Sequence, residues 1–103
     1  MITFVEDARF TEAANRLLRE DALMALMQKL AASPDAGDVI PHSGGCRKLR
    51  FAAKGKGSRG GARVIYFHRS HAGQILLLEL YAKNEKSDLT PAELKLLKQK
   101  VKP

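Results

Sequence analysis

Two strand-like segments joined by only four residues constrain the fold more than any other feature of this sequence. Residues 63–69 are rich in β-branched and aromatic side chains, and residues 74–82 form the most apolar segment of the chain. The link Ser70-His71-Ala72-Gly73 suits a hairpin and is too short for a parallel crossover. Residues 47–53 precede them as a third strand, with Leu49 and Phe51 on one face. The pattern therefore predicts an antiparallel sheet.

Apolar residues at helical spacing predict two helices before this sheet. One set comprises Phe10, Ala14, Leu17 and Leu18, and the other comprises Leu23, Leu26, Met27 and Leu30. On one continuous helix, at about 100° per residue, the two sets would point in nearly opposite directions. We therefore expect a break near residues 19–21. A short first strand is expected over residues 2–5, and the turn at residues 33–37 ends the second helix.

The last element predicted is a C-terminal helix. Thr90 is placed to cap it, Pro91 to begin it and Glu93 to complete a capping box. Leu94, Leu97 and Val101 form its apolar stripe. The order strand–helix–helix–strand–strand–strand–helix predicts one α+β domain over residues 1–103. We expect its helices to cover one face of a small antiparallel sheet and to leave the other face partly open.

Charge is unevenly distributed along the chain. Residues 1–42 hold four Lys/Arg against seven Asp/Glu, a net −3, whereas residues 43–103 hold fourteen against four, a net +10. This asymmetry favours an anionic partner for the second half, although a solvated surface that maintains solubility is the alternative. A single cysteine, no signal peptide and no apolar run long enough to cross a membrane lead us to expect a cytoplasmic protein without disulfides.

The stretch KGKGSRGGAR, residues 54–63, concentrates glycine and basic residues between two predicted strands. It is not a Walker phosphate loop, because Gly61 and Ala62 stand where Lys and Ser/Thr would be required. Glycines would allow the backbone to approach a phosphate, which Lys54, Lys56, Arg59 and Arg63 would neutralise. The alternative is a hairpin loop whose charges are simply solvated.

Further basic residues lie on the neighbouring strands. Lys48 and Arg50 occupy the face opposite Leu49, and Tyr81 and Lys83 share the non-leucine face at the end of the last strand. Cations around an aromatic ring are typical of a nucleic-acid surface, where phosphates pair with charge and a base stacks on the ring. A half-buried tyrosine with its hydroxyl in water is an equally good interpretation of Tyr81.

Metal and histidine chemistry are less favoured. His42, Cys46, His68 and His71 are the only thiol or imidazole groups, and their spacing does not indicate a zinc site, so we expect no metal or other cofactor. His68 is either a general base or an ordinary strand histidine.

Several segments together resemble a known family. They are the run from Gly44 to Phe51, the loop ending Gly60-Gly61-Ala62-Arg63-Val64-Ile65-Tyr66, the run from Leu80 to Lys86, and the run from Asp88 to Glu93. In this order and spacing they are similar to the HigB branch of the RelE/ParE superfamily of type II toxins. The similarity covers nearly the whole chain after residue 20.

The resemblance implies a toxin that enters the ribosomal A site and cuts messenger RNA there. It implies catalytic roles for Arg63, Lys83, Tyr81, Lys48 and Arg50, and RNA contacts from Arg47, Lys54, Lys56 and Arg59. It also implies a helix-turn-helix antitoxin of the HigA type, through which alone operator DNA would be bound. A non-enzymatic nucleic-acid-binding or co-repressor module of the same fold is the alternative.

Overall fold

The computed structural model describes residues 1–52, 61–86 and 88–103 of the chain. In chain order, its elements are β1 (Thr3–Glu6), α1 (Ala8–Leu17), α2 (Glu20–Ala32), β2 (Asp38–Val39), β3 (Arg47–Phe51), β4 (Ala62–Arg69), the 3-10 turn η1 (Ser70–Ala72), β5 (Gln74–Ala82) and α3 (Pro91–Lys100). The α+β class predicted from the sequence is confirmed. Lys54, Lys56 and Arg59 lie outside the described residues.

The sheet has the strand order β1-β5-β4-β3-β2. The pairs β3–β4 and β4–β5 are antiparallel, as the sequence pattern predicted, and β2–β3 is antiparallel as well. The first strand differs, because β1 lies parallel to β5, with Thr3 opposite Gln74. The two intervening helices supply the long connection that a parallel neighbour needs. The two-residue strand β2 was not predicted, because such a length carries no alternation.

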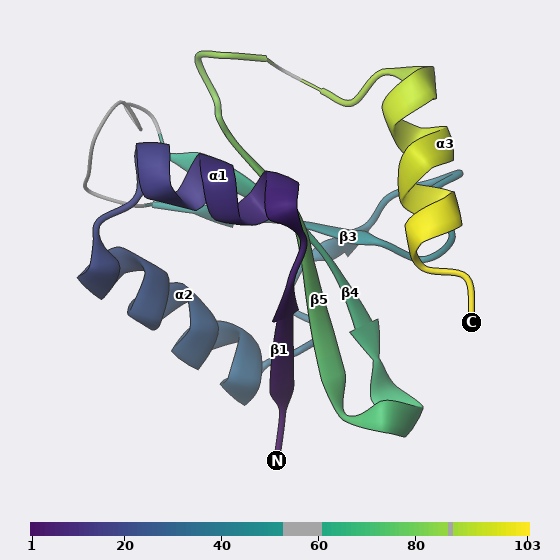
Figure 1. The fold of residues 1–103 in the computed structure, drawn as a ribbon, viewed down its shortest axis with the longest axis horizontal. Helices are drawn as coiled ribbons and strands as arrows, with labels where there is room; N and C mark the ends of the chain where they lie inside the picture. Colours follow the sequence, from purple (N-terminus) through teal and green to yellow (C-terminus); the bar gives the residue numbers. More distant parts are fainter. Residues whose placement is uncertain (53–60, 87) are drawn as a thin grey trace.

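One face of the sheet, called here the α1/α2 face, carries the larger core (Figure 1). Phe10, Leu26 and Leu30 from the two helices are fully buried against it. The predicted break between the helices is confirmed: Leu18 ends α1 in an extended conformation, and Arg19 is extended before α2 begins.

The opposite face, called here the α3 face, is also covered in part. Leu97 of α3 and Val101, which caps its end, form a second core cluster with Ile65, Leu78 and Tyr81. The three helices therefore lie on two sides of the sheet (Figure 1). The expectation that all helices share one face was therefore wrong. An apolar helix stripe must be buried, and α1 and α2 already occupy the other face.

A β-bulge changes which residues of β5 share a face. The β4–β5 register pairs Ile65 with Glu79 but Tyr66 with Leu77, so one additional residue lies in β5. Leu78 therefore packs in the α3 cluster, whereas Leu80 packs in the α1/α2 core. The alternation read from the sequence placed both leucines on one face, and it fails at this bulge.

The start of α3 is confirmed in detail. Thr90 Oγ1 accepts from Glu93 N at 3.2 Å, and Glu93 Oε1 accepts from Thr90 N at 2.8 Å, which completes the capping box. This cap places the segment before α3, which carries Asp88 and Leu89, beside the basic strand β3. None of the helices in the described ranges is long and apolar enough to cross a membrane.

Candidate nucleic-acid interface

Three cationic side chains meet on the α3 face of β3 and β4. Arg50 lies directly opposite Arg63 in the antiparallel register, and Lys48 lies two pairs further along, opposite Ile65. Alternation directs Leu49 and Phe51 into the core on the other side, which leaves the basic residues on this face. We call Lys48, Arg50 and Arg63 the cationic face.

The cationic face borders a hollow of about 460 Å³. Its walls also include Asp38 and Ala36 from the β2 side. Like charges directly opposite each other on a sheet are destabilising, so the Arg50–Arg63 pair makes the free protein less stable. A bound anion would relieve this repulsion, and arginine forks suit the oxygens of a phosphate.

Lys48 also has an acidic partner from another element. Its Nζ lies 3.8 Å from Asp88 Oδ1, and Asp88 precedes α3. The Lys48 side chain is about one-third exposed and that of Asp88 is three-quarters exposed. An exposed pair at this distance contributes little to stability, so Lys48 can exchange Asp88 for a phosphate at small cost.

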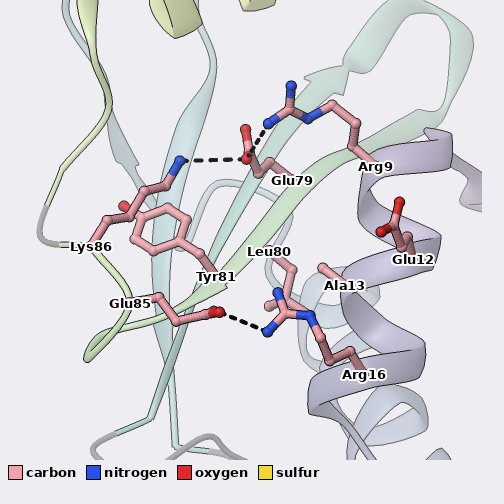
Figure 2. A pocket seen from close by; sticks show the side chains of 9 residues that line it. All are labelled: Arg9, Glu12, Ala13, Arg16, Glu79, Leu80, Tyr81, Glu85 and Lys86. Atoms are coloured by element: carbon pink, nitrogen blue, oxygen red, sulfur yellow. Dashed lines mark hydrogen bonds and ion pairs between the residues drawn. The ribbon is translucent and has the colours of Figure 1, made fainter.

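Tyr81 lies opposite Arg63 on β5 but is buried, with 3% of its surface exposed. Lys86 Nζ lies over its ring at 4.8 Å from the centroid (Figure 2). Burial, followed by the charge of Asp88, raises the pKa of Tyr81 above its ordinary value, while Arg63 acts in the opposite direction. Neither interpretation of Tyr81 fits this burial. Its ring is not open for stacking on a base and its hydroxyl does not stand in water, because α3 and Lys86 cover the side chain.

The hydroxyl of Tyr81 is the one buried side-chain oxygen or nitrogen without a hydrogen-bond partner in the part of the chain that the structure describes. A buried hydroxyl without a partner costs free energy. Because both Asp88 and Arg63 influence its pKa, this hydroxyl lies within electrostatic range of the cationic face.

Lys83 follows the end of β5 and is exposed. Its backbone N donates to Gly61 O at 3.3 Å, which places Lys83 at the end of the sheet where β4 begins, close to Arg63. Three of the four predicted catalytic cations therefore lie together, and the fourth lies at the adjoining end of the sheet.

Arg47 lies apart from this group. Its Nη1 donates to Gly37 O at 2.8 Å and to Asp35 O at 3.3 Å, so it holds the turn between α2 and β2. It is on the opposite side of β3 from Lys48, as strand alternation requires. Arg47 therefore does not belong to the cationic face, and its RNA contact stays a prediction.

His68 is also distant from the cationic face. It lies five residues along β4 from Arg63, a rise of about 16 Å, and its Nδ1 is 2.9 Å from Asp35 Oδ1. That hydrogen bond, the largest influence, lowers the pKa of Asp35. The placement supports the interpretation of His68 as an ordinary strand histidine. Among the described residues, His, Cys, Asp and Glu nowhere form a group of three suited to a metal ion.

An ion-pair network beside Tyr81 was missed by sequence reasoning. The buried carboxylate of Glu79 accepts from Arg9 Nη2 at 3.0 Å and from Lys86 Nζ at 3.5 Å (Figure 2). Lys86 also pairs with Glu93. The network connects α1, β5 and α3 through the segment that carries Lys83. One signal was available, because a glutamate between Leu78 and Leu80 in an apolar strand requires a partner.

A second ion pair holds the same segment. Arg16 Nη1 donates to Glu85 Oε2 at 2.6 Å, and Glu85 Oε1 accepts from Ala82 N at 2.9 Å (Figure 2). The Ala82 hydrogen bond, followed by Arg16, lowers the pKa of Glu85. The turn after β5 is thus attached to α1 on one side and to α3 on the other.

Comparison with known proteins identifies the family. Residues 4–102 match the family described as the RelE toxin of the RelE/RelB toxin–antitoxin system. The chain belongs to the RelE toxin family. As a RelE-family toxin, it shares its fold with a double mutant of the E. coli toxin RelE in the free state, at 15% identity and a TM-score of 0.60, over 96% of this chain and 95% of that one.

A second solved structure with the RelE fold is a chain of the intact E. coli RelBE toxin–antitoxin complex. It is 14% identical to this RelE-family chain, with a TM-score of 0.58 over 80% of this chain and 96% of that one. Both comparisons support the fold, and the assignment to the HigB branch remains a prediction.

Proposed function

We propose that this RelE-family toxin is a ribosome-dependent mRNA endonuclease of the HigB branch that inhibits translation in the cytoplasm. Ribonuclease activity is a known property of the family. The observation that carries the proposal is the cationic face, where Arg50 stands opposite Arg63 with Lys48 beside them. Such a group attracts a phosphodiester and stabilises the extra negative charge of its transition state.

The proposed chemistry is transesterification at one phosphodiester. The 2′-oxygen loses its proton and bonds to phosphorus, and the bond from phosphorus to the 5′-oxygen breaks as that oxygen takes up a proton. Arg63 and Arg50 hold the phosphate oxygens. Lys48 and Lys83 are the candidates for the base that takes the proton of the 2′-hydroxyl.

Tyr81 takes part in proton transfer in this proposal. Tyr81 lies on β5 opposite Arg63, and its buried hydroxyl has no hydrogen-bond partner among the described residues. The mechanism requires no metal, since side chains meet the charge of the phosphate. Without a strong base, such a site depends on the ribosome to hold the RNA in line, and positioning alone can supply roughly 7–11 kcal/mol.

The proposal assigns further RNA contacts to Lys54, Lys56, Arg59 and Arg47. It also includes a cognate helix-turn-helix antitoxin of the HigA type, through which alone operator DNA would be bound. An antitoxin partner is supported by the solved RelBE toxin–antitoxin complex, one of whose chains has the same fold. A partner with an acidic segment would complement the cationic face.

Message cleavage mapped on programmed ribosomes tests the proposal, with Arg63→Ala as the variant and Lys29→Ala, on the exposed side of α2, as the control. We expect Arg63→Ala to remain folded by circular dichroism and to lose about 100- to 1,000-fold in rate. A folded Arg63→Ala protein that cuts at the wild-type rate would move the site elsewhere. Antitoxin binding without cleavage by the wild type would favour the co-repressor module.

A further inference from the structure

The β-bulge in β5 brings an acidic and an aromatic side chain to the α3 face. Alternation continued from Leu77, which packs in the α1/α2 core, would place Glu79 and Tyr81 on the α1/α2 face. The extra residue at the bulge instead leaves Glu79 opposite Ile65, a member of the α3 cluster. Tyr81 then lies opposite Arg63 of the cationic face. Bulges beside functional sites commonly redirect a side chain in this way.

Lys86 joins the two side chains that the bulge brings together. Its Nζ lies 3.5 Å from Glu79 Oε1 and 4.8 Å from the centroid of the Tyr81 ring (Figure 2). It also pairs with Glu93, which belongs to the capping box of α3. Two carboxylates, one from β5 and one from α3, therefore hold one ammonium over one aromatic ring. Only 28% of the Lys86 side chain is exposed, and partial desolvation strengthens the attraction between a cation and a ring.

The hydroxyl of Tyr81 makes no hydrogen bond that could hold the ring, as far as the described ranges extend. Packing in the α3 cluster and the Lys86 ammonium orient the ring instead. This arrangement suits a hydroxyl that exchanges a proton with a ligand, because a hydroxyl bonded within the protein would first have to break that bond. Tyr66 provides the contrast: its hydroxyl accepts from Gly37 N at 2.9 Å and is fixed by the protein.

We propose that Lys86 is a positioning residue, which holds the Tyr81 ring in place and leaves its hydroxyl free for the proton transfer. Lys86 touches neither the RNA nor the reacting atoms and acts through Tyr81. The role requires a positive charge over the ring, which arginine can also supply because its guanidinium stacks on aromatic faces. The inference rests on the proposed function, since it specifies how one of the reacting groups is oriented.

The motion of the Tyr81 ring tests the positioning role without cleavage. Ring flips would be measured by NMR exchange spectroscopy in the full chain, whose other tyrosine is Tyr66. Lys86→Met keeps an unbranched side chain but removes the charge, so we expect flips at least about fivefold faster, the fold-change to which one such attraction corresponds. Lys86→Arg should restore the wild-type flip rate. An unchanged flip rate in Lys86→Met would overturn the inference.

Lys100→Met is the matched control for this measurement. Lys100 Nζ lies 3.0 Å from Asp7 Oδ2, and 24% of its side chain is exposed, so it too connects α3 to the rest of the protein by a partly buried ion pair. It makes no contact with the Tyr81 ring. We expect Lys100→Met to leave the flip rate as in the wild type. Equal acceleration in both variants would mean that loosening α3, and not the charge over the ring, governs the motion, and would refute the positioning role.

A double-mutant cycle on programmed ribosomes tests whether Lys86 acts through Tyr81. Lys86→Met should lower kcat about fivefold or more and change KM little, and Lys86→Arg should recover most of the loss. In a Tyr81→Phe background, Lys86→Met should have no further effect, because residues that act through one group are not additive. An undiminished loss of kcat in that background would overturn the positioning role.

The same measurements separate this inference from the proposed function. If the wild type cuts message and Lys86→Met cuts it at the same rate, the nuclease stands and the inference fails. If the wild type cuts nothing, the nuclease proposal fails, and the ring-flip rates alone decide whether Lys86 holds Tyr81.

Discussion

Arg50 and Arg63 occupy directly opposed positions on β3 and β4, on the sheet face that α3 covers only in part. Two like charges in this position repel each other and lower the stability of the free fold. A site for a polyanion requires positive charges held close together in this way. Their repulsion lowers the free energy of unfolding, and this effect can be measured.

The first prediction concerns that cost. Arg50→Gln should leave the protein as stable or stabilise it by about 0.2–1 kcal/mol, because it removes the repulsion from Arg63. The same change should weaken binding to single-stranded RNA and reduce its salt dependence, since one phosphate contact is lost. Urea unfolding and fluorescence anisotropy at several salt concentrations measure the two effects. A marked loss of stability would show that Arg50 is structural; Arg19→Gln, an exposed arginine before α2, is the control.

The second prediction concerns acid. Burial, the largest influence, raises the pKa of Glu93, but Lys86 and the Thr90 N–H outweigh it and hold the pKa below the ordinary 4.5. A carboxyl with a lowered pKa binds fewer protons folded than unfolded. Its stabilisation is therefore complete above the ordinary value and is lost as pH falls through the folded pKa.

Glu93→Gln isolates this contribution, because glutamine keeps the capping bond to Thr90 but loses the pair with Lys86. The variant should be less stable than the wild type at neutral pH and nearly equal to it well below pH 4.5. Urea midpoints across this range provide the measurement. Parallel curves for the two proteins at every pH would contradict the assignment.

The third prediction concerns Cys46. Its side chain is fully buried, and burial raises the pKa of the thiol to about 11, against a smaller opposing effect from Ser43. The thiolate is the reactive form, so the native protein should react with a disulfide reagent at pH 8 far more slowly than the urea-unfolded chain. Fast reaction of the folded protein would mean that Cys46 becomes exposed at equilibrium.

Local signals in the sequence predicted local structure well. The capping box at Thr90, the helix break near residues 19–21 and the alternation of Lys48 and Leu49 each depend on neighbours within a few residues, and each is confirmed. The hairpin of β4 and β5 also followed from a link of four residues. These features are determined by spacing alone.

Features set by distant partners were harder to predict. Alternation indicates which residues share a face but not which helix covers it, so Tyr81 was expected to be open to a base or half-buried, and α3 instead buries it. The bulge that separates Leu78 from Leu80 depends on the register with β4. For the same reason, the sequence pattern predicted that the basic residues of β3 and β4 lie together. It did not predict that Asp38 and Asp88, from other elements, lie beside them.

The fourth prediction concerns the turn at Gly37, which is buried between β3 and Tyr66. A Cβ at this position would lie 2.9 Å from Lys48 O and 3.0 Å from the Tyr66 ring. Gly37→Ala should therefore destabilise the protein by about 1–3 kcal/mol through overpacking. Tyr66→Phe removes the hydroxyl that accepts from Gly37 N at 2.9 Å and should cost a similar amount. Urea unfolding of both variants provides the test, and wild-type stability in Gly37→Ala would show that the turn relaxes.

The last prediction concerns Glu79, the buried carboxylate between Arg9 and Lys86. Glu79→Gln keeps the ion pair between Lys86 and Glu93. It removes the negative charge that pairs with Arg9 of α1 and with Lys86 in the segment after β5. Breaking a fully buried pair costs about 3–5 kcal/mol; because the Arg9 side chain is half exposed, we expect about 1–2 kcal/mol here. Arg16→Gln, which breaks the exposed pair with Glu85, should cost no more than about 1 kcal/mol.

In the proposed nuclease, Glu79→Gln should also slow cleavage, because Lys83 and Tyr81 lose their support. Cleavage rates measured well below the unfolding midpoint separate the two effects, and an unchanged rate in a destabilised variant would limit Glu79 to a structural role.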